Sequence, residues 1–79
     1  MPKLRRLSGK EVVSIFSQFG FAIHHQKGSH IKLKKEIGDT HQTLTVPNHK
    51  ELDRGTLRAI IRQASRYISL EELEKHFYA

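Results

Sequence analysis

The sequence predicts an α+β domain of two layers, in which helices cover one face of a three-stranded antiparallel sheet. Apolar residues recur at helical spacing over 12–19 and again over 57–64, which predicts two amphipathic helices. Between them, residues 21–46 alternate apolar and polar side chains around two glycine turns, which indicates strands. Strands joined by such short turns run antiparallel. The expected order is αβββα with a short extra C-terminal helix, and we expect residues 1–79 to form a single domain.

The first helix has sequence signals at both of its ends. Ser8 and Glu11 stand at the spacing of a capping box, and Leu7 and Val12 stand at the spacing of a hydrophobic staple. Gly20 is expected to end the helix, because glycine readily adopts the left-handed conformation that closes helices. The buried stripe should contain Val12, Ile15, Phe16 and Phe19.

The register of the first hairpin follows from keeping its two faces chemically distinct. A two-residue loop of Lys27 and Gly28 would place Ile23 opposite Lys32, which mixes apolar and charged side chains on one face. A three-residue loop avoids this, so we expect it, with Gly28 or its neighbour in the left-handed conformation. The expected pairs are then Ile23–Leu33, His24–Lys32 and Gln26–His30. The strands should cover about 21–26, 30–36 and 41–46, with Pro47 ending the third.

One face of this sheet is expected to be apolar and the other polar and basic. The apolar face, which the helices can cover, should carry Phe21, Ile23, Ile31, Leu33, Leu44 and Val46. The other face should carry His24, Gln26, His30, Lys32, Lys34, Thr43 and Thr45. We expect this second face to stay open to solvent, because the chain holds nothing apolar enough to cover it. The arrangement resembles the fold of double-stranded-RNA-binding domains.

The second helix is expected to begin after Asp53 as its N-cap, with Leu52 and Leu57 as its staple. Its buried stripe should contain Leu57, Ile60, Ile61 and Ala64. A stripe of arginines repeats every fourth residue on another face, at Arg58, Arg62 and Arg66. A short last helix should begin at Ser69, with Glu72 completing a second capping box.

The charge of the chain favours a polyanionic partner. Lysine and arginine number 14 against 8 aspartates and glutamates, for a net charge of +6. Residues 69–79 hold three glutamates against one lysine, a net of −2, so residues 1–68 carry +8. A field of this sign attracts nucleic acid and speeds its encounter with the protein. A membrane surface is the alternative, but the chain has no strongly hydrophobic amphipathic helix with tryptophan to insert.

Several classes of protein are excluded by composition. Cysteine is absent, which excludes disulfides, thiolate chemistry and cysteine-based zinc sites. The basic N-terminus is not followed by an apolar run, so we do not expect a signal peptide. No stretch approaches the ~20 apolar residues of a membrane span. A cytoplasmic protein without membrane contact is therefore expected.

The segment Gly28-Ser29-His30 is the first candidate for chemistry. A histidine that begins a strand beside a glycine turn has a free ring, and imidazole titrates near neutrality, so it can act as general base or general acid. Lys32 and Lys34 share its face and could hold a phosphate beside the ring. The alternative is that His30 is an ordinary exposed turn histidine.

Two other basic features could bind anions. The loop Pro47-Asn48-His49 leads to the start of the second helix, where unpaired N–H groups attract phosphate, and Gly55-Thr56 would allow close approach. The arginine stripe and the basic residues Lys3, Arg5, Arg6 and Lys10 are typical of phosphate-backbone contact. The alternatives are a plain connecting loop and a solvated helix face.

The six histidines are not expected to bind a metal ion. His24 and His25 should point to opposite faces of one strand, so they cannot hold one ion together. No pair of histidines stands four residues apart on a helix, and no thiolate is present.

The ordered set of motifs resembles the HicA family. The resemblance rests on Gly28-Ser29-His30 at a strand start, on Val46-Pro47-Asn48-His49, and on the long run from Glu51 to Ala64. Together with the Gly9-Lys10-Glu11-Val12 helix start and Gly20-Phe21, it spans nearly the whole chain. The resemblance implies a small ribonuclease toxin that cleaves messenger RNA, stops translation and is neutralised by a HicB-type antitoxin. It also implies that His30 is the catalytic residue and that neither a metal nor another cofactor takes part.

The mechanism expected on this basis is metal-independent cleavage. His30 would take the proton of a ribose 2′-hydroxyl, and Lys32 or Lys34 would stabilise the charge on phosphorus. The general acid stays open between water, His24 and a lysine. We expect RNA to contact Lys27, Gly28, Ser29, Lys32, Lys34, Arg58 and Arg62. The alternatives are a non-catalytic double-stranded-RNA-binding module and a protein-interaction domain that meets an acidic partner.

Overall fold

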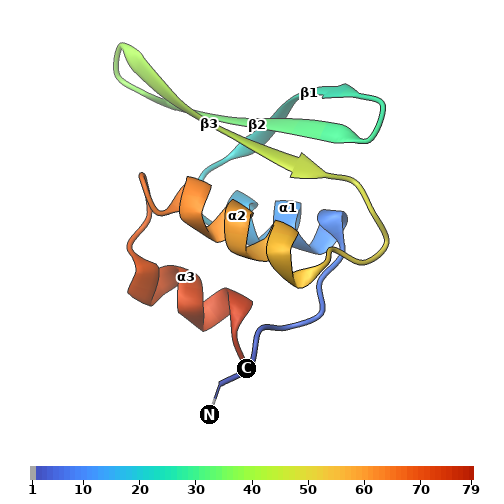
Figure 1. Cartoon of the computed structure of the whole chain (residues 1–79). Coiled ribbons are helices and arrows are strands. Elements are labelled where there is room, and N and C mark those ends of the chain that lie inside the picture. The colour runs from blue at the N-terminus through green and yellow to red at the C-terminus, as the bar shows by residue number, and fades with distance from the viewer. Residues whose placement is uncertain (1) are drawn as a thin grey trace.

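The computed structural model describes residues 2–79 and contains the predicted elements in the predicted order (Figure 1). Three antiparallel strands form one sheet in the order β1-β2-β3, and the helices cover one side of it. The α+β two-layer architecture with an additional C-terminal helix is therefore confirmed. The elements are α1 (Gly9–Ser17), β1 (Ala22–Lys27), β2 (His30–Ile37), β3 (Thr40–Pro47), α2 (Arg54–Ala64) and α3 (Leu70–Phe77).

The helix starts follow the capping residues that the sequence predicts. The Ser8 hydroxyl accepts the Glu11 N–H at 3.0 Å, and the Glu11 carboxylate accepts the Ser8 N–H at 2.8 Å, which completes the capping box of α1. Asp53 caps α2. At α3 only half of the predicted box forms, because Ser69 accepts the Glu72 N–H while the Glu72 carboxylate lies 3.2 Å from the Lys75 ammonium.

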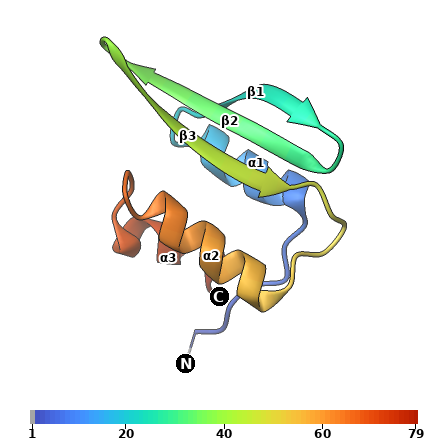
Figure 2. The same ribbon diagram turned by 45° about the horizontal axis from the view of Figure 1, so that its top comes forward.

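The core lies between the sheet and the helices (Figure 2) and contains most of the residues that the periodicity predicts, although Ile23 is exposed and Phe19 is only partly buried. Aromatic contacts join its parts: Phe16 of α1 lies 5.8 Å from Phe77 of α3 and 6.1 Å from Phe21, measured between ring centroids. The fully buried side chains include Phe16, Phe77, Leu7, Leu33, Leu44, Leu57, Leu73, Val12 and Val46. This core holds the sheet rigidly, so the positions along its open face are well defined.

The β1–β2 hairpin differs from the prediction in its turn. Lys27 pairs with His30 across a two-residue turn of Gly28 and Ser29, so the expected three-residue loop is wrong. Gly28 has φ 57°, the left-handed conformation that such a turn requires. The pair Ile23–Leu33 is nevertheless kept, because the register shifts at a β-bulge between Ile23 and His25.

The bulge changes which side chains of β1 share a face. His25, not His24, is the partner of Lys32, and Gln26 is paired with the buried Ile31 instead of with His30. Gln26 therefore lies on the helix side of the sheet, where it lines a recess with Val13 and Ile31, and not on the open face as predicted.

Ile23 was expected to be buried but is 57% exposed, although its partner Leu33 is only 1% exposed. All six residues of β1 are exposed, whereas Leu44 and Val46 of the other edge strand, β3, are fully buried, so the helices lie toward the β3 side of the sheet. The helices cover β2 and β3 and leave this edge strand largely uncovered.

The two end segments of the chain pair with each other. The Lys3 N–H donates to the Ala79 carbonyl at 2.7 Å, the Ala79 N–H donates to the Lys3 carbonyl at 2.8 Å, and the Arg5 N–H donates to the Phe77 carbonyl at 2.8 Å. These segments lie below the helices, on the side away from the sheet (Figure 1). They therefore close the helical layer without approaching the open face.

Candidate active site

His30 is the first residue of β2 and is exposed on the open face of the sheet. Its neighbours Ile31 and Leu33 are buried, so the strand alternation turns the His30 ring away from the helices. It lines a recess of about 610 Å³ at the end of the hairpin. The other residues that line this recess are His25, Lys27, Gly28, Ser29 and Lys32. The structure thus brings together five of the residues that the sequence predicts to contact RNA or act on it.

The two predicted lysines of β2 lie in different surroundings. Lys32 stands two residues from His30 on the same face and lines the same recess. The Lys34 ammonium lies 3.6 Å from the Glu36 carboxylate, and its side chain lines a separate hollow with His24 and Lys35. Lys27 and Lys32 are therefore the two lysines that line the recess with His30.

A second loop supports the turn that carries His30. The Asn48 N–H donates to the Ser29 carbonyl at 2.6 Å, and Pro47 is the cross-strand partner of His30. The Gly9 N–H in turn donates to the His49 carbonyl at 2.9 Å. The start of α1, the loop after β3 and the Gly28-Ser29 turn are therefore linked by backbone hydrogen bonds into one unit.

Gly9 makes this linkage sterically feasible, a role that the sequence alone did not predict. A Cβ atom at Gly9 would lie 2.1 Å from the Pro47 carbonyl oxygen and 2.9 Å from the Asn48 Cα. Only glycine therefore allows the first turn of α1 to lie against this loop. The signal in the sequence was the position of Gly9 directly after the N-cap, since glycine is a poor helix former and has no reason of its own to stand there.

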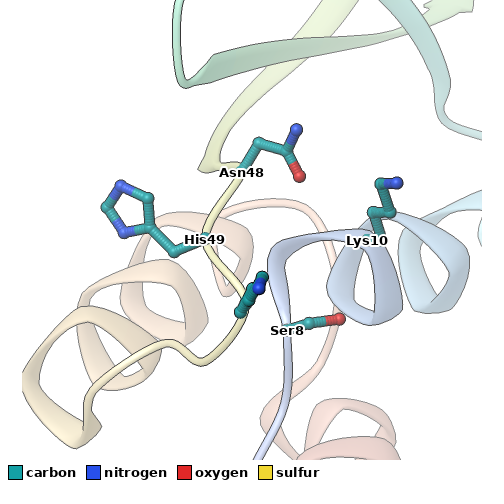
Figure 3. A pocket seen from close by; sticks show the side chains of 5 residues that line it. Ser8, Lys10, Asn48 and His49 are labelled. Carbon is teal, nitrogen blue, oxygen red and sulfur yellow. The ribbon is translucent and has the colours of Figure 1, made fainter.

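The Asn48-His49 loop forms a second hollow, of about 350 Å³, beside the start of α1 (Figure 3). Lys10 and Asn48 flank it, while the His49 ring points away from both of them. The pKa of Asp53 is lowered mainly by the hydrogen bonds from the N–H and hydroxyl of Thr56, with a smaller contribution from the charge of His49. His49 therefore belongs to the surroundings of α2 and does not line the His30 recess.

Arg58 and Arg62 lie on α2 and are exposed, but not on the open face of the sheet. Gln63 marks the flank of α2 that touches β3, because its side chain accepts the Thr45 N–H at 2.9 Å. At 3.6 residues per turn, Arg58 and Arg62 lie about 140° and about 100° around the helix from Gln63. The arginines therefore face away from β3, and the structure does not bring them together with the His30 recess.

The basic N-terminal residues are separate from His30 as well. Lys3, Arg5 and Arg6 line a groove of about 650 Å³ with Arg54, and Glu51 and Asp53 line its acidic part. This groove lies at the start of α2, so positive charge extends over the helical layer in addition to the open face of the sheet.

Residues 2–79 gather no group of three or more histidine or acidic side chains suited to holding a metal ion. Within the same residues, no helix has the length and apolar character to cross a membrane.

Comparison with known proteins identifies the family of the chain. No individual curated protein and no solved structure matches it. The sequence model of the family described as HicA toxin of bacterial toxin–antitoxin matches residues 9–65, which is more than half of the chain. The matched segment runs from the start of α1 to the end of α2 and includes the His30 recess and the loop that supports it. The chain therefore belongs to the HicA family and is the toxin of a toxin–antitoxin pair.

Proposed function

We propose that this toxin is a metal-independent endoribonuclease that cuts messenger RNA at the His30 recess and so inhibits translation. The observation that carries the proposal is the placement of an exposed imidazole beside Lys27 and Lys32 on an uncovered sheet face. A ribose-phosphate backbone can reach such a surface without any opening of the fold. The net charge of +6 favours its approach.

In the proposed reaction, neutral His30 accepts the proton of the ribose 2′-hydroxyl while the oxygen attacks the adjacent phosphorus. Lys27 and Lys32 stabilise the negative charge that develops on the phosphoryl oxygens. The Gly28-Ser29 turn allows the phosphate to approach the backbone closely, because Gly28 carries no side chain and has nothing within 4 Å of its Cβ position. A general base of this kind contributes about 10²–10⁴-fold in rate.

The remaining RNA contacts fall into two groups. Gly28, Ser29, Lys32 and, farther along the strand, Lys34 would bind nucleotides near the cut. Arg58 and Arg62 would hold the phosphate backbone at a distance from it, on the flank of α2. We propose that a HicB-like antitoxin neutralises the toxin by covering the recess with acidic side chains.

The central experiment compares the parent protein with His30→Ala on mixed-sequence RNA, after purification free of the antitoxin. The variant should lose cleavage by at least about 100-fold, as removal of a general base predicts, while it keeps most of its RNA affinity. His41→Ala is the matched control, because His41 is also exposed on the sheet but lies at the far end of β3. Cleavage by His30→Ala at the parent rate would show that His30 has been wrongly assigned.

The same experiment separates the enzyme from a non-catalytic double-stranded-RNA-binding module. Such a module shares the fold and the basic surface but yields no fragments. If the parent protein binds structured RNA and leaves it intact, and its expression does not arrest growth, the nuclease proposal is wrong.

A further inference from the structure

With His30 as general base, the group that gives a proton to the departing 5′-oxygen is still unassigned, and the β-bulge in β1 brings a second imidazole to the recess. Strict alternation along β1 would put His25 on the helix side of the sheet. The extra residue at His24 shifts the alternation, so that His25 lies opposite Lys32 on the open face. Both His25 and His30 then line the same recess.

The register fixes how the two histidines are arranged. Lys27 pairs with His30 and His25 pairs with Lys32, so His25 and His30 are diagonal neighbours on antiparallel strands. Side chains in such diagonal positions arise from backbone sites about 7–8 Å apart and can both reach a group placed between them. In an in-line displacement, the attacking and the leaving oxygens lie on opposite sides of the phosphorus atom. A phosphate held between the two rings therefore presents one of these oxygens to each histidine.

Nothing acidic competes for either ring inside the recess. The titratable side chains that line it are His25, His30, Lys27 and Lys32. Among residues 2–79, no carboxylate lines the recess. Both histidines are exposed, so each ring can exchange protons with water between turnovers. The lysines on the same surface supply the charge that holds a phosphate between the rings.

We propose that His25 is the general acid of the cleavage, an inference that rests on the ribonuclease function proposed for His30. The 2′-oxygen forms its bond to phosphorus as His30 takes its proton, and the bond from phosphorus to the 5′-oxygen breaks as protonated His25 donates a proton to that oxygen. The products are a 2′,3′-cyclic phosphate and a 5′-hydroxyl. His30 is left protonated and His25 neutral, and proton exchange with water restores both.

The test uses two RNA oligonucleotides of one sequence around a cleavage position first mapped with the parent protein. The second oligonucleotide carries sulfur in place of the bridging 5′-oxygen at that position. A thiolate leaves without needing a proton, so the loss of a general acid matters little for this substrate, whereas the loss of a general base still matters. The variants are His25→Gln and His30→Gln, and His41→Gln is the matched control, because His41 is an exposed sheet histidine that pairs with Glu36, far from the recess.

His25→Gln should lower single-turnover cleavage of the oxygen substrate by at least about 100-fold and that of the sulfur substrate by less than about 10-fold. His30→Gln should lower both by about the same large factor, and His41→Gln should stay within about 3-fold of the parent on both. Circular dichroism and the thermal midpoint of each variant establish that it is folded.

Two results would overturn the assignment of His25 while leaving the nuclease intact. One is cleavage of the oxygen substrate by His25→Gln at the parent rate, and the other is an equal loss on both substrates, which indicates a role in binding or structure. Failure of the parent protein to cut either substrate would instead overturn the nuclease function itself, and the acid with it.

Discussion

Gly9 is a single residue on which the arrangement of the recess depends. Its missing side chain allows the Pro47 carbonyl to lie where a Cβ atom would be 2.1 Å away. The atoms in the way belong to backbone and not to a flexible side chain, so they cannot move aside without shifting the loop. That loop is bonded to the Ser29 carbonyl, and the Gly28-Ser29 turn leads directly to His30.

Gly9→Ala should therefore destabilise the fold by about 1–3 kcal/mol, the usual cost of forcing a methyl group into a packed site. Gly55→Ala is the matched control, because a Cβ at Gly55 meets only the Asp53 Oδ1 atom at an ordinary 3.5 Å. Since glycine inside a helix is less favourable than alanine, the control should gain about 0.5–1 kcal/mol. Urea unfolding of both variants measures the difference, and equal midpoints for them would contradict this account of Gly9.

At the scale of the elements, much of the fold could be predicted because its signals are local. The caps at Ser8 and Asp53 and the apolar stripes of α1 and α2 depend only on neighbouring residues, and they are confirmed apart from Phe19, which lies beyond the end of α1 and is only partly buried. The bulge at His24 had no such signal, since neither glycine nor proline stands near it. The sequence consequently predicted His24 opposite Lys32, where the structure places His25.

The exposure of Ile23 and the contact of Gly9 were missed for a related reason. Each depends on which segments meet in space: α1 covers only part of the edge strand β1, and the start of α1 meets the end of β3. Periodicity reports that a face is apolar but not how far the covering element extends over it.

The start of α2 provides a test of pH dependence. The Thr56 hydrogen bonds lower the pKa of Asp53 in the folded protein below its usual value of 3.8. A lowered pKa means that the charged cap contributes stability above the unfolded-state pKa and loses it as the pH falls through the folded-state pKa. Asp53→Asn keeps a capping side chain but cannot titrate.

We therefore expect the parent to be more stable than Asp53→Asn at pH 7, with the difference shrinking as the pH falls below 3.8. Free energies of unfolding from urea titrations at pH 7, 4 and 2.5 measure this difference. A gap between the two proteins that stays constant over this range would show that the Asp53 charge does not stabilise α2.

At the scale of the whole molecule, positive charge lies both on the open face of the sheet and on the helical layer. The recess with His30 lies on the open sheet face, whereas Arg58 and Arg62 lie on the flank of α2 that faces away from β3. If both surfaces contact one RNA, the arginines contribute affinity and not chemistry.

The double substitution Arg58→Ala and Arg62→Ala should weaken RNA binding and reduce the slope of log affinity against log salt by about 1 for each lost phosphate contact. The rate of cleavage at saturating RNA should not change. Lys75→Ala is the control, because Lys75 pairs with Glu72 in the acidic C-terminal segment and should leave the slope unchanged. An unaltered slope in the double variant would remove the two arginines from the RNA-binding surface.

The pairing of residues 3–5 with 77–79 has a practical consequence for handling the toxin. Since both segments emerge beneath the helices and opposite the β1–β2 hairpin, a fluorophore or a solid-support anchor attached beside Ala79 leaves the hairpin facing the solution. The same proximity permits a short peptide to join the two termini, with new ends opened at the exposed Gly38-Asp39 turn. Such a circular permutant would reverse the order in which the hairpin and α2 leave the ribosome. It would keep every strand pairing and cut only the turn that connects β2 to β3.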